Sequence, residues 1–121
     1  MARISFMGAM NTVGCSAVLV DTGAEKILLD YGTKIQEAPP KFPLPVEEKL
    51  NATLLSHAHL DHSGGLALLH AKGNHSPIFA AGVTKSLTEL LLLDSIKISR
   101  EEGIELPFNK HDVTRTIESF I

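Results

Sequence analysis

The sequence predicts one mixed α/β domain, with antiparallel strands early in the chain and helices packed on one face of the sheet. Short apolar runs with the character of strands fill the first 30 residues. Later, apolar runs at 51–56 and 77–81 alternate with segments of helical periodicity. The length of 121 residues suits a single domain, and 44% apolar with 21% charged residues is ordinary for a globular protein.

The start of the chain predicts three strands. The first is residues 3–8 (RISFMG). The second, residues 15–22 (CSAVLVDT), has an unbroken apolar centre, which is typical of a strand covered on both faces. A turn then leads into residues 26–30 (KILLD), so we expect the second and third strands to form a hairpin.

The middle of the chain predicts a loop, a strand and a short helix. Residues 31–49 contain four of the six prolines, which excludes a central strand or a helix interior there. Residues 51–56 (NATLLS) predict a strand that leads directly into a histidine-rich turn. We expect a short helix to open near Ser63 and to stop at Gly73.

The last part of the chain predicts one more strand, at 77–81, and two helices. The longer helix begins at residue 84 or 86 and ends near residue 100. Its leucines at 90–93 are consecutive and span about 300° of the helix surface, so we expect cover on more than one side. The final helix takes Asn109 as its N-cap and Asp112 in its first turn.

Composition excludes several classes of function. The net charge of −3 argues against a general affinity for nucleic acid, although a basic groove can be local. No apolar run approaches the roughly 18 residues of a membrane helix, so we expect no membrane partner. With one cysteine the chain forms no internal disulfide and no thiolate zinc site, and a reducing, cytoplasmic compartment is expected.

The turn in residues 54–65 (LLSHAHLDHSGG) indicates a metal site. Imidazole nitrogens and carboxylate oxygens are ligands of zinc and similar divalent ions. His57 and His59 project to one side of extended backbone and can converge on one ion. Asp61 and His62 lie past a bend and can turn toward a second ion. Two ions about 3.5–4 Å apart can hold a hydroxide and clamp a phosphoryl or carbonyl group.

This His-x-His-x-Asp-His stretch resembles the signature of the metallo-β-lactamase superfamily. The resemblance implies an α/β fold, a metallo-β-lactamase-like αβ/βα sandwich with a two-metal site between its sheets. The chain resembles only the first half of that sandwich, a mixed sheet with helices on one face. Asp30 matches an aspartate that orients a metal ligand by a hydrogen bond in that superfamily. The alternative for Asp30 is a simple residue of a strand-end turn.

Longer segments resemble the β-CASP nucleases, in particular archaeal relatives of the cleavage and polyadenylation specificity factor. These segments are residues 6–32 (FMGAMNTVGCSAVLVDTGAEKILLDYG), 39–45 (PPKFPLP), 91–102 (LLLDSIKISREE) and 107–120 (PFNKHDVTRTIESF). The resemblance implies a zinc-dependent ribonuclease of the mRNA 3′-end processing type. Such an enzyme hydrolyses RNA phosphodiesters with a hydroxide held by two zinc ions.

Catalytic zinc has about three protein ligands, so two per ion from this turn leave the site incomplete. The family's later motifs, two further histidines and an aspartate, are not in this sequence. We interpret His70, His75, His111 and Asp94 as helix-end, loop or surface residues rather than ligands. We therefore interpret 1–121 as the truncated N-terminal part of a metallo-β-lactamase domain.

The functional hypothesis is accordingly the metal-binding part of a ribonuclease that is inactive alone. It would need the missing C-terminal half or a partner chain, and RNA is its substrate when complete. Whether this chain is itself an enzyme is left open, and no catalytic acid is assigned. The alternatives are a hydrolase of a small thioester or lactone, and a non-catalytic fragment or assembly subunit.

Overall fold

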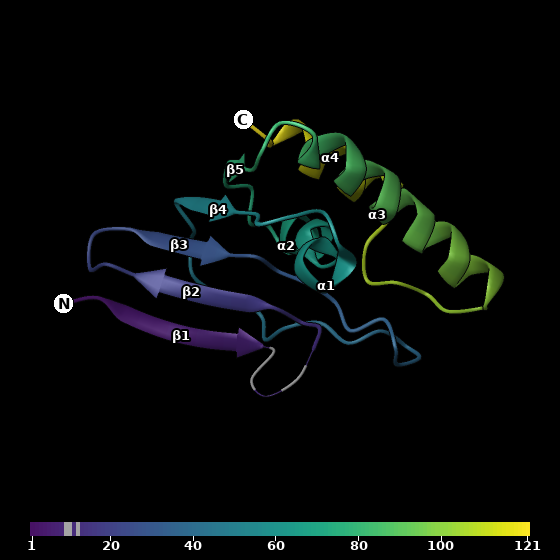
Figure 1. The fold of residues 1–121 in the computed structure, drawn as a ribbon, viewed down its shortest axis with the longest axis horizontal. Coiled ribbons are helices and arrows are strands. Elements are labelled where there is room, and N and C mark those ends of the chain that lie inside the picture. The colour runs from purple at the N-terminus through teal and green to yellow at the C-terminus, as the bar shows by residue number, and fades with distance from the viewer. Residues whose placement is uncertain (9–10, 12) are drawn as a thin grey trace.

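A five-stranded mixed sheet with helices on one face forms the protein, in a computed structural model that describes residues 1–8, 11 and 13–121 (Figure 1). The strands are β1 (Arg3–Gly8), β2 (Ala17–Asp21), β3 (Lys26–Leu29), β4 (Ala52–Leu54) and β5 (Ile78–Phe79). They lie in the order of the chain. The β1–β2 and β2–β3 pairs are antiparallel, whereas β3–β4 and β4–β5 are parallel. The predicted fold class and the hairpin are confirmed.

The helices of the described residues are α1 (Leu60–Ser63), α2 (Leu66–Ala71), α3 (Thr84–Glu101) and α4 (Lys110–Glu118). The predicted cap of α4 is present: Asn109 Oδ1 accepts from Asp112 N–H at 3.0 Å, and the Asp112 carboxylate accepts from Asn109 N–H at 3.0 Å. This reciprocal pair satisfies two helix-end donors. None of the described helices is both long and apolar enough to cross a membrane.

Several element boundaries differ from the prediction because of local backbone geometry. The predicted strand 15–22 begins only at Ala17, since Cys15 adopts a left-handed conformation with a φ of 56°. Asp30, at a φ of 61°, likewise ends β3 one residue early. The predicted short helix is two helices, and α1 lies within the histidine turn itself.

One face of the sheet packs against the helices. Leu19, Leu28, Thr53 and Ile78 are paired across neighbouring strands and are all buried. In Figure 1, β1 lies at the sheet edge away from α3 and α4. The core therefore lies between this face and the helical layer.

The opposite surface, which we call the open sheet face, is apolar on every strand. It comprises Ile4 and Phe6 of β1, Val18 and Val20 of β2, Ile27 and Leu29 of β3, Ala52 and Leu54 of β4, and Phe79 of β5. Ile4 and Phe6 are each 59% exposed, and Val18 is only half-buried. Residues 15–22 are less covered on this face than expected among the described residues: Val18 and Val20 are half-buried here, whereas Leu19 on the other face is buried.

The expectation for the leucines of α3 is wrong. Leu92 is fully buried, but Leu90 is 64% exposed. The residues that α3 buries recur every three or four positions, at Thr84, Thr88, Leu92, Ile96 and Ser99. This repeat makes a single stripe, so α3 is covered on one side only.

Candidate metal centre

The candidate ligands follow β4, on a turn whose backbone is anchored in the core. Ala58 is buried, and Ser63 Oγ donates a hydrogen bond of 2.7 Å to the carbonyl oxygen of Ala58. Leu60 packs against the hydrophobic core from the start of α1. These residues anchor the turn on its inner side, so His57 and His59 are left on its outer side.

The segment that follows β3 is bonded to the same turn. Tyr31 N–H donates to His62 O at 2.9 Å, and Thr33 N–H donates to Leu60 O at 2.8 Å. The Tyr31 hydroxyl donates to the carbonyl oxygen of Leu44 at 2.9 Å, which ties the proline-rich loop to this brace. Burial raises the pKa of Tyr31 to about 12, so the hydroxyl keeps its proton at physiological pH.

Glycines permit this close approach of two backbones. A Cβ at Gly65 would lie 2.7 Å from Tyr31 Cδ2, so a glycine is needed where these two segments approach. A Cβ at Gly32 would overlap the carbonyl group of Asp61. Sequence reasoning missed Gly32, although its position directly after Asp30-Tyr31 was a usable signal.

Three of the four predicted ligands converge. Ligand atoms of His57, His59 and Asp61 all lie within 4.8 Å of one another. His59 is exposed and the other two are half-buried, so the cluster is open to solvent. Two imidazoles and a carboxylate match the ligand types and the number of protein ligands that catalytic zinc takes. The residues present therefore fit a divalent metal ion.

His62 adjoins this cluster. Its Nε2 lies 3.3 Å from Asp61 Oδ2, and its ring centroid lies 4.0 Å from that of His57. Asp61 is thus near both His62 and the other two histidines. The predicted division, with His57 and His59 on one ion and the other pair on a second, stays a prediction.

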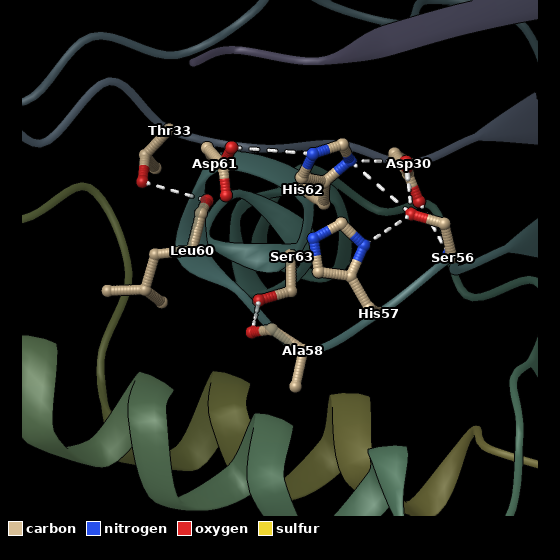
Figure 2. Close-up of polar contacts among 9 residues, drawn as sticks. All are labelled: Asp30, Thr33, Ser56, His57, Ala58, Leu60, Asp61, His62 and Ser63. Atoms are coloured by element: carbon tan, nitrogen blue, oxygen red, sulfur yellow. Dashed lines mark hydrogen bonds and ion pairs between the residues drawn. The ribbon is translucent and has the colours of Figure 1, made fainter. Parts of the chain in front are cut away.

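Asp30 lies directly behind His62. Its Oδ2 is 2.7 Å from His62 Nδ1, and its Oδ1 accepts a hydrogen bond of 2.7 Å from Ser56 N–H (Figure 2). Asp30 is buried, and its backbone is in the left-handed conformation. Aspartate tolerates this conformation better than most residues because its short side chain can form local hydrogen bonds. The contact is the one that its predicted orienting role requires, and the role itself stays a prediction.

Ser56 also belongs to this network, and sequence reasoning missed it. Its Oγ lies 2.8 Å from Asp30 Oδ2 and 3.0 Å from His57 Nδ1 (Figure 2). A serine is common at strand ends, so its place just before His57 was a weak signal. The pairing with Asp30 depends on β3 and β4 lying side by side, which only the structure shows.

The remaining candidates lie elsewhere. His70 is half-buried, with Nδ1 3.8 Å from Asp112 Oδ1 and its ring stacked on His75 at 4.0 Å between centroids. His70 lies in the last turn of α2, as expected of a helix-end residue, but it is half-buried rather than solvated. Burial lowers the pKa of His70, the His75 ring acts in the same direction, and Asp112 opposes it. His111 and Asp94 are exposed, as expected.

Known proteins resemble this chain over nearly its whole length. Residues 8–93 match the family described as anti-Pycsar protein Apyc1. A probable RNase, MJ4, of Methanocaldococcus jannaschii is 35% identical over 98% of this chain and 28% of its own length. The transcription termination factor FttA of Methanothermobacter thermautotrophicus is 34% identical over 99% of this chain and 20% of its own length. The RNase aCSPSF2 of Saccharolobus solfataricus is 32% identical over 98% of this chain and 24% of its own length.

The fold also matches a solved structure. A diphosphatase of the PhnP family superposes with a TM-score of 0.53 at 17% identity, over 79% of this chain and 48% of that one. This likeness shows the metallo-β-lactamase fold, of which the chain forms about half. The chain therefore belongs to the anti-Pycsar protein Apyc1 family and, as its sequence predicts, to the metallo-β-lactamase superfamily, where it corresponds to the N-terminal portion of archaeal β-CASP proteins.

Proposed function

We propose that this chain is the metal-binding part of a zinc-dependent ribonuclease that hydrolyses RNA phosphodiesters. The observation that carries the proposal is the convergence of His57, His59 and Asp61 within 4.8 Å. Relatives named as RNases, similar over 98% of this chain, support RNA as the substrate class. A cytoplasmic location is part of the proposal, since RNA processing and a lone cysteine both suit a reducing compartment.

His57, His59, Asp61 and His62 would hold two divalent ions, with zinc favoured by the donor set. When bound, such ions supply Lewis acidity, which activates water and stabilises negative charge on phosphoryl oxygens. The chain's own contribution is orientation. The backbone brace from Tyr31 fixes the turn, and the Asp30 carboxylate fixes the ring of His62.

We also propose that further polypeptide completes the site, so that residues 1–121 are part of a metallo-β-lactamase domain. Four side chains shared by two ions give two ligands each, whereas catalytic zinc takes about three from protein. The open sheet face supports this proposal, because stacked sheets bury such apolar faces against each other. Later residues of the same protein or a partner chain would both cover the open sheet face and supply the remaining metal ligands.

A substrate test separates the ribonuclease from the thioester or lactone hydrolase, because both activities need the same metal turn. The complete protein, zinc-loaded, is offered a labelled RNA and a thioester in parallel. The ribonuclease proposal expects RNA cleavage that is lost in the His59→Ala variant and kept in His111→Ala, which changes an exposed histidine outside the cluster. Cleavage of the thioester alone would remove the proposal.

Residues 1–121 by themselves provide the complementary test. We expect weak zinc binding and little RNA cleavage from residues 1–121 alone. The alternative of a non-catalytic subunit predicts the same result. A purified chain that holds two zinc ions and cleaves RNA unaided would contradict the need for further ligands. A complete protein that binds zinc but turns over neither substrate would favour the non-catalytic alternative.

A further inference from the structure

We propose that Ser56 is a positioning residue that extends the influence of Asp30 to His57, so that one carboxylate sets the tautomers of two metal ligands. The inference rests on the proposed function insofar as His57 and His62 bind metal. What it predicts, the positions of one ring proton on His57 and one on His62, is a property of the metal-free chain.

Three hydrogen-bond donors surround the Asp30 carboxylate. Its Oδ1 accepts the N–H of Ser56 at 2.7 Å. Its Oδ2 lies 2.8 Å from Ser56 Oγ and 2.7 Å from His62 Nδ1. An ionised carboxylate only accepts hydrogen bonds, so both of these neighbours donate their protons to Oδ2. His62 therefore carries a proton on Nδ1.

The hydroxyl of Ser56 links the Asp30 carboxylate to the ring of His57. A hydroxyl has one proton, and that proton is directed at Asp30. Toward His57 Nδ1, at 3.0 Å, Ser56 Oγ therefore presents only lone pairs. A hydrogen bond between them requires His57 to carry its proton on Nδ1 as well.

A second contact of Ser56 does not disturb this assignment. Its Oγ lies 3.4 Å from His62 Nδ1, well beyond the 2.7 Å between that nitrogen and Asp30 Oδ2. The shorter contact to a charged acceptor takes the His62 proton. Each proton in the network thus has one acceptor.

The consequence concerns the opposite ring nitrogens. A neutral imidazole carries one proton, so a proton on Nδ1 leaves Nε2 with a free lone pair. His57 and His62 then both present Nε2 as the metal ligand, before any ion arrives. Asp61 Oδ2 lies 3.3 Å from His62 Nε2 but makes no hydrogen bond with it among the described residues, so this contact places no proton on that nitrogen. Among the hydrogen bonds of the described residues, none engages the ring of His59 (its neighbour in the cluster), so His59 serves as an internal reference.

Two substitutions of nearly equal shape separate the hydroxyl from the volume of the side chain. Ser56→Thr keeps the hydroxyl, and Ser56→Val removes it while filling the same space. Ser95→Ala is the matched control, because Ser95 Oγ donates to Leu92 O at 2.8 Å within α3, away from the turn.

The decisive measurement is the tautomer of each histidine, from long-range ¹H–¹⁵N correlation spectra of the metal-free chain at about pH 8, where ordinary imidazoles are neutral. We expect Nδ1–H for His57 and His62 in the wild type, in Ser56→Thr and in Ser95→Ala. In Ser56→Val we expect His57 to shift toward Nε2–H while His62 is unchanged. A wild-type His57 with its proton on Nε2, or an unchanged His57 in Ser56→Val, would overturn the inference.

Zinc affinity gives a second readout, by competition with a chelator. We expect Ser56→Val to bind about 10–100-fold more weakly than Ser56→Thr at the site that includes His57. Equal affinities would count against the inference. If the chain binds no zinc at all, the proposed function fails while the tautomers still decide the role of Ser56. Should Ser56→Val not fold, the wild-type and Ser56→Thr spectra decide it.

Discussion

Asp30 shows how one residue serves both the backbone and the side chains of this site. Its left-handed conformation, with a φ of 61°, turns the chain out of β3. The same turn brings its carboxylate to the end of β4, within 2.7 Å of His62 Nδ1 and of Ser56 N. The sequence alone suggested the contact with a ligand, because the resemblance included an aspartate at this position. For Ser56 as a second partner, the sequence offered only the weak signal of its place just before His57.

His70 gives a prediction at the same scale, for stability against pH. Burial lowers the pKa of His70 in the folded chain, so the unfolded chain takes up a proton there first. The free energy of unfolding therefore loses a contribution as the pH falls below about 6.5, the usual value for histidine. The contribution is fully present above that pH.

The His70→Gln variant tests this prediction, because glutamine does not titrate. We expect urea unfolding at about pH 7.5 and pH 5.5 to show a smaller loss of stability on acidification in the variant than in the wild type. The exposed His111 provides the control through His111→Gln. Identical pH dependence in the wild type and His70→Gln would mean that His70 is not held neutral.

At the scale of elements, the brace between the segment after β3 and the histidine turn gives the next prediction. In Gly32→Ala the new methyl would overlap the carbonyl of Asp61, so the two backbones must separate. We expect a loss of about 1–3 kcal/mol in the free energy of unfolding, together with weaker zinc binding. Gly82→Ala is the matched control, since no atom lies within 4 Å of the added methyl. Equal effects of the two substitutions on stability would contradict the brace.

The elements themselves were largely predictable. Strands at 3–8 and 26–30 and the helix capped by Asn109 followed from local patterns, because apolar periodicity and side-chain caps act within a few residues. The helix α1 was not predictable, since four residues are too few for a periodic signal. The position of Asp61, near His62 and near the other two histidines, depends on how α1 turns, so the pairing of ligands could not be read from spacing.

At the scale of the whole molecule, the open sheet face is the main feature that the helices leave uncovered. Its apolar side chains include Ile4 and Phe6 at 59% exposure and Phe79 at 42%. An apolar patch of several hundred Å² on a soluble protein usually marks an interface or causes association. The unbroken apolar pattern of residues 15–22 predicted a strand covered on both faces of the sheet. Among the described residues, only the face toward the helices is well covered.

This face predicts self-association of the isolated chain. We expect residues 1–121 to bind a hydrophobic dye and to form larger species as concentration rises, with both effects reduced in Phe6→Ser. Leu90→Ser, at a residue 64% exposed on the outer side of α3, is the control. Analytical ultracentrifugation distinguishes the outcomes, and a strictly monomeric wild type without dye binding would show that the face needs no cover.

The most direct test of the metal centre is zinc titration of the purified chain by calorimetry, with His59→Ala compared with His111→Ala. His59 is exposed, so its loss removes a ligand with little disturbance of the core. The account predicts weak but measurable zinc binding by the wild type, no detectable binding in His59→Ala, and no change in His111→Ala. A wild type that takes up no zinc, or a His59→Ala chain that binds zinc as the wild type does, would contradict it.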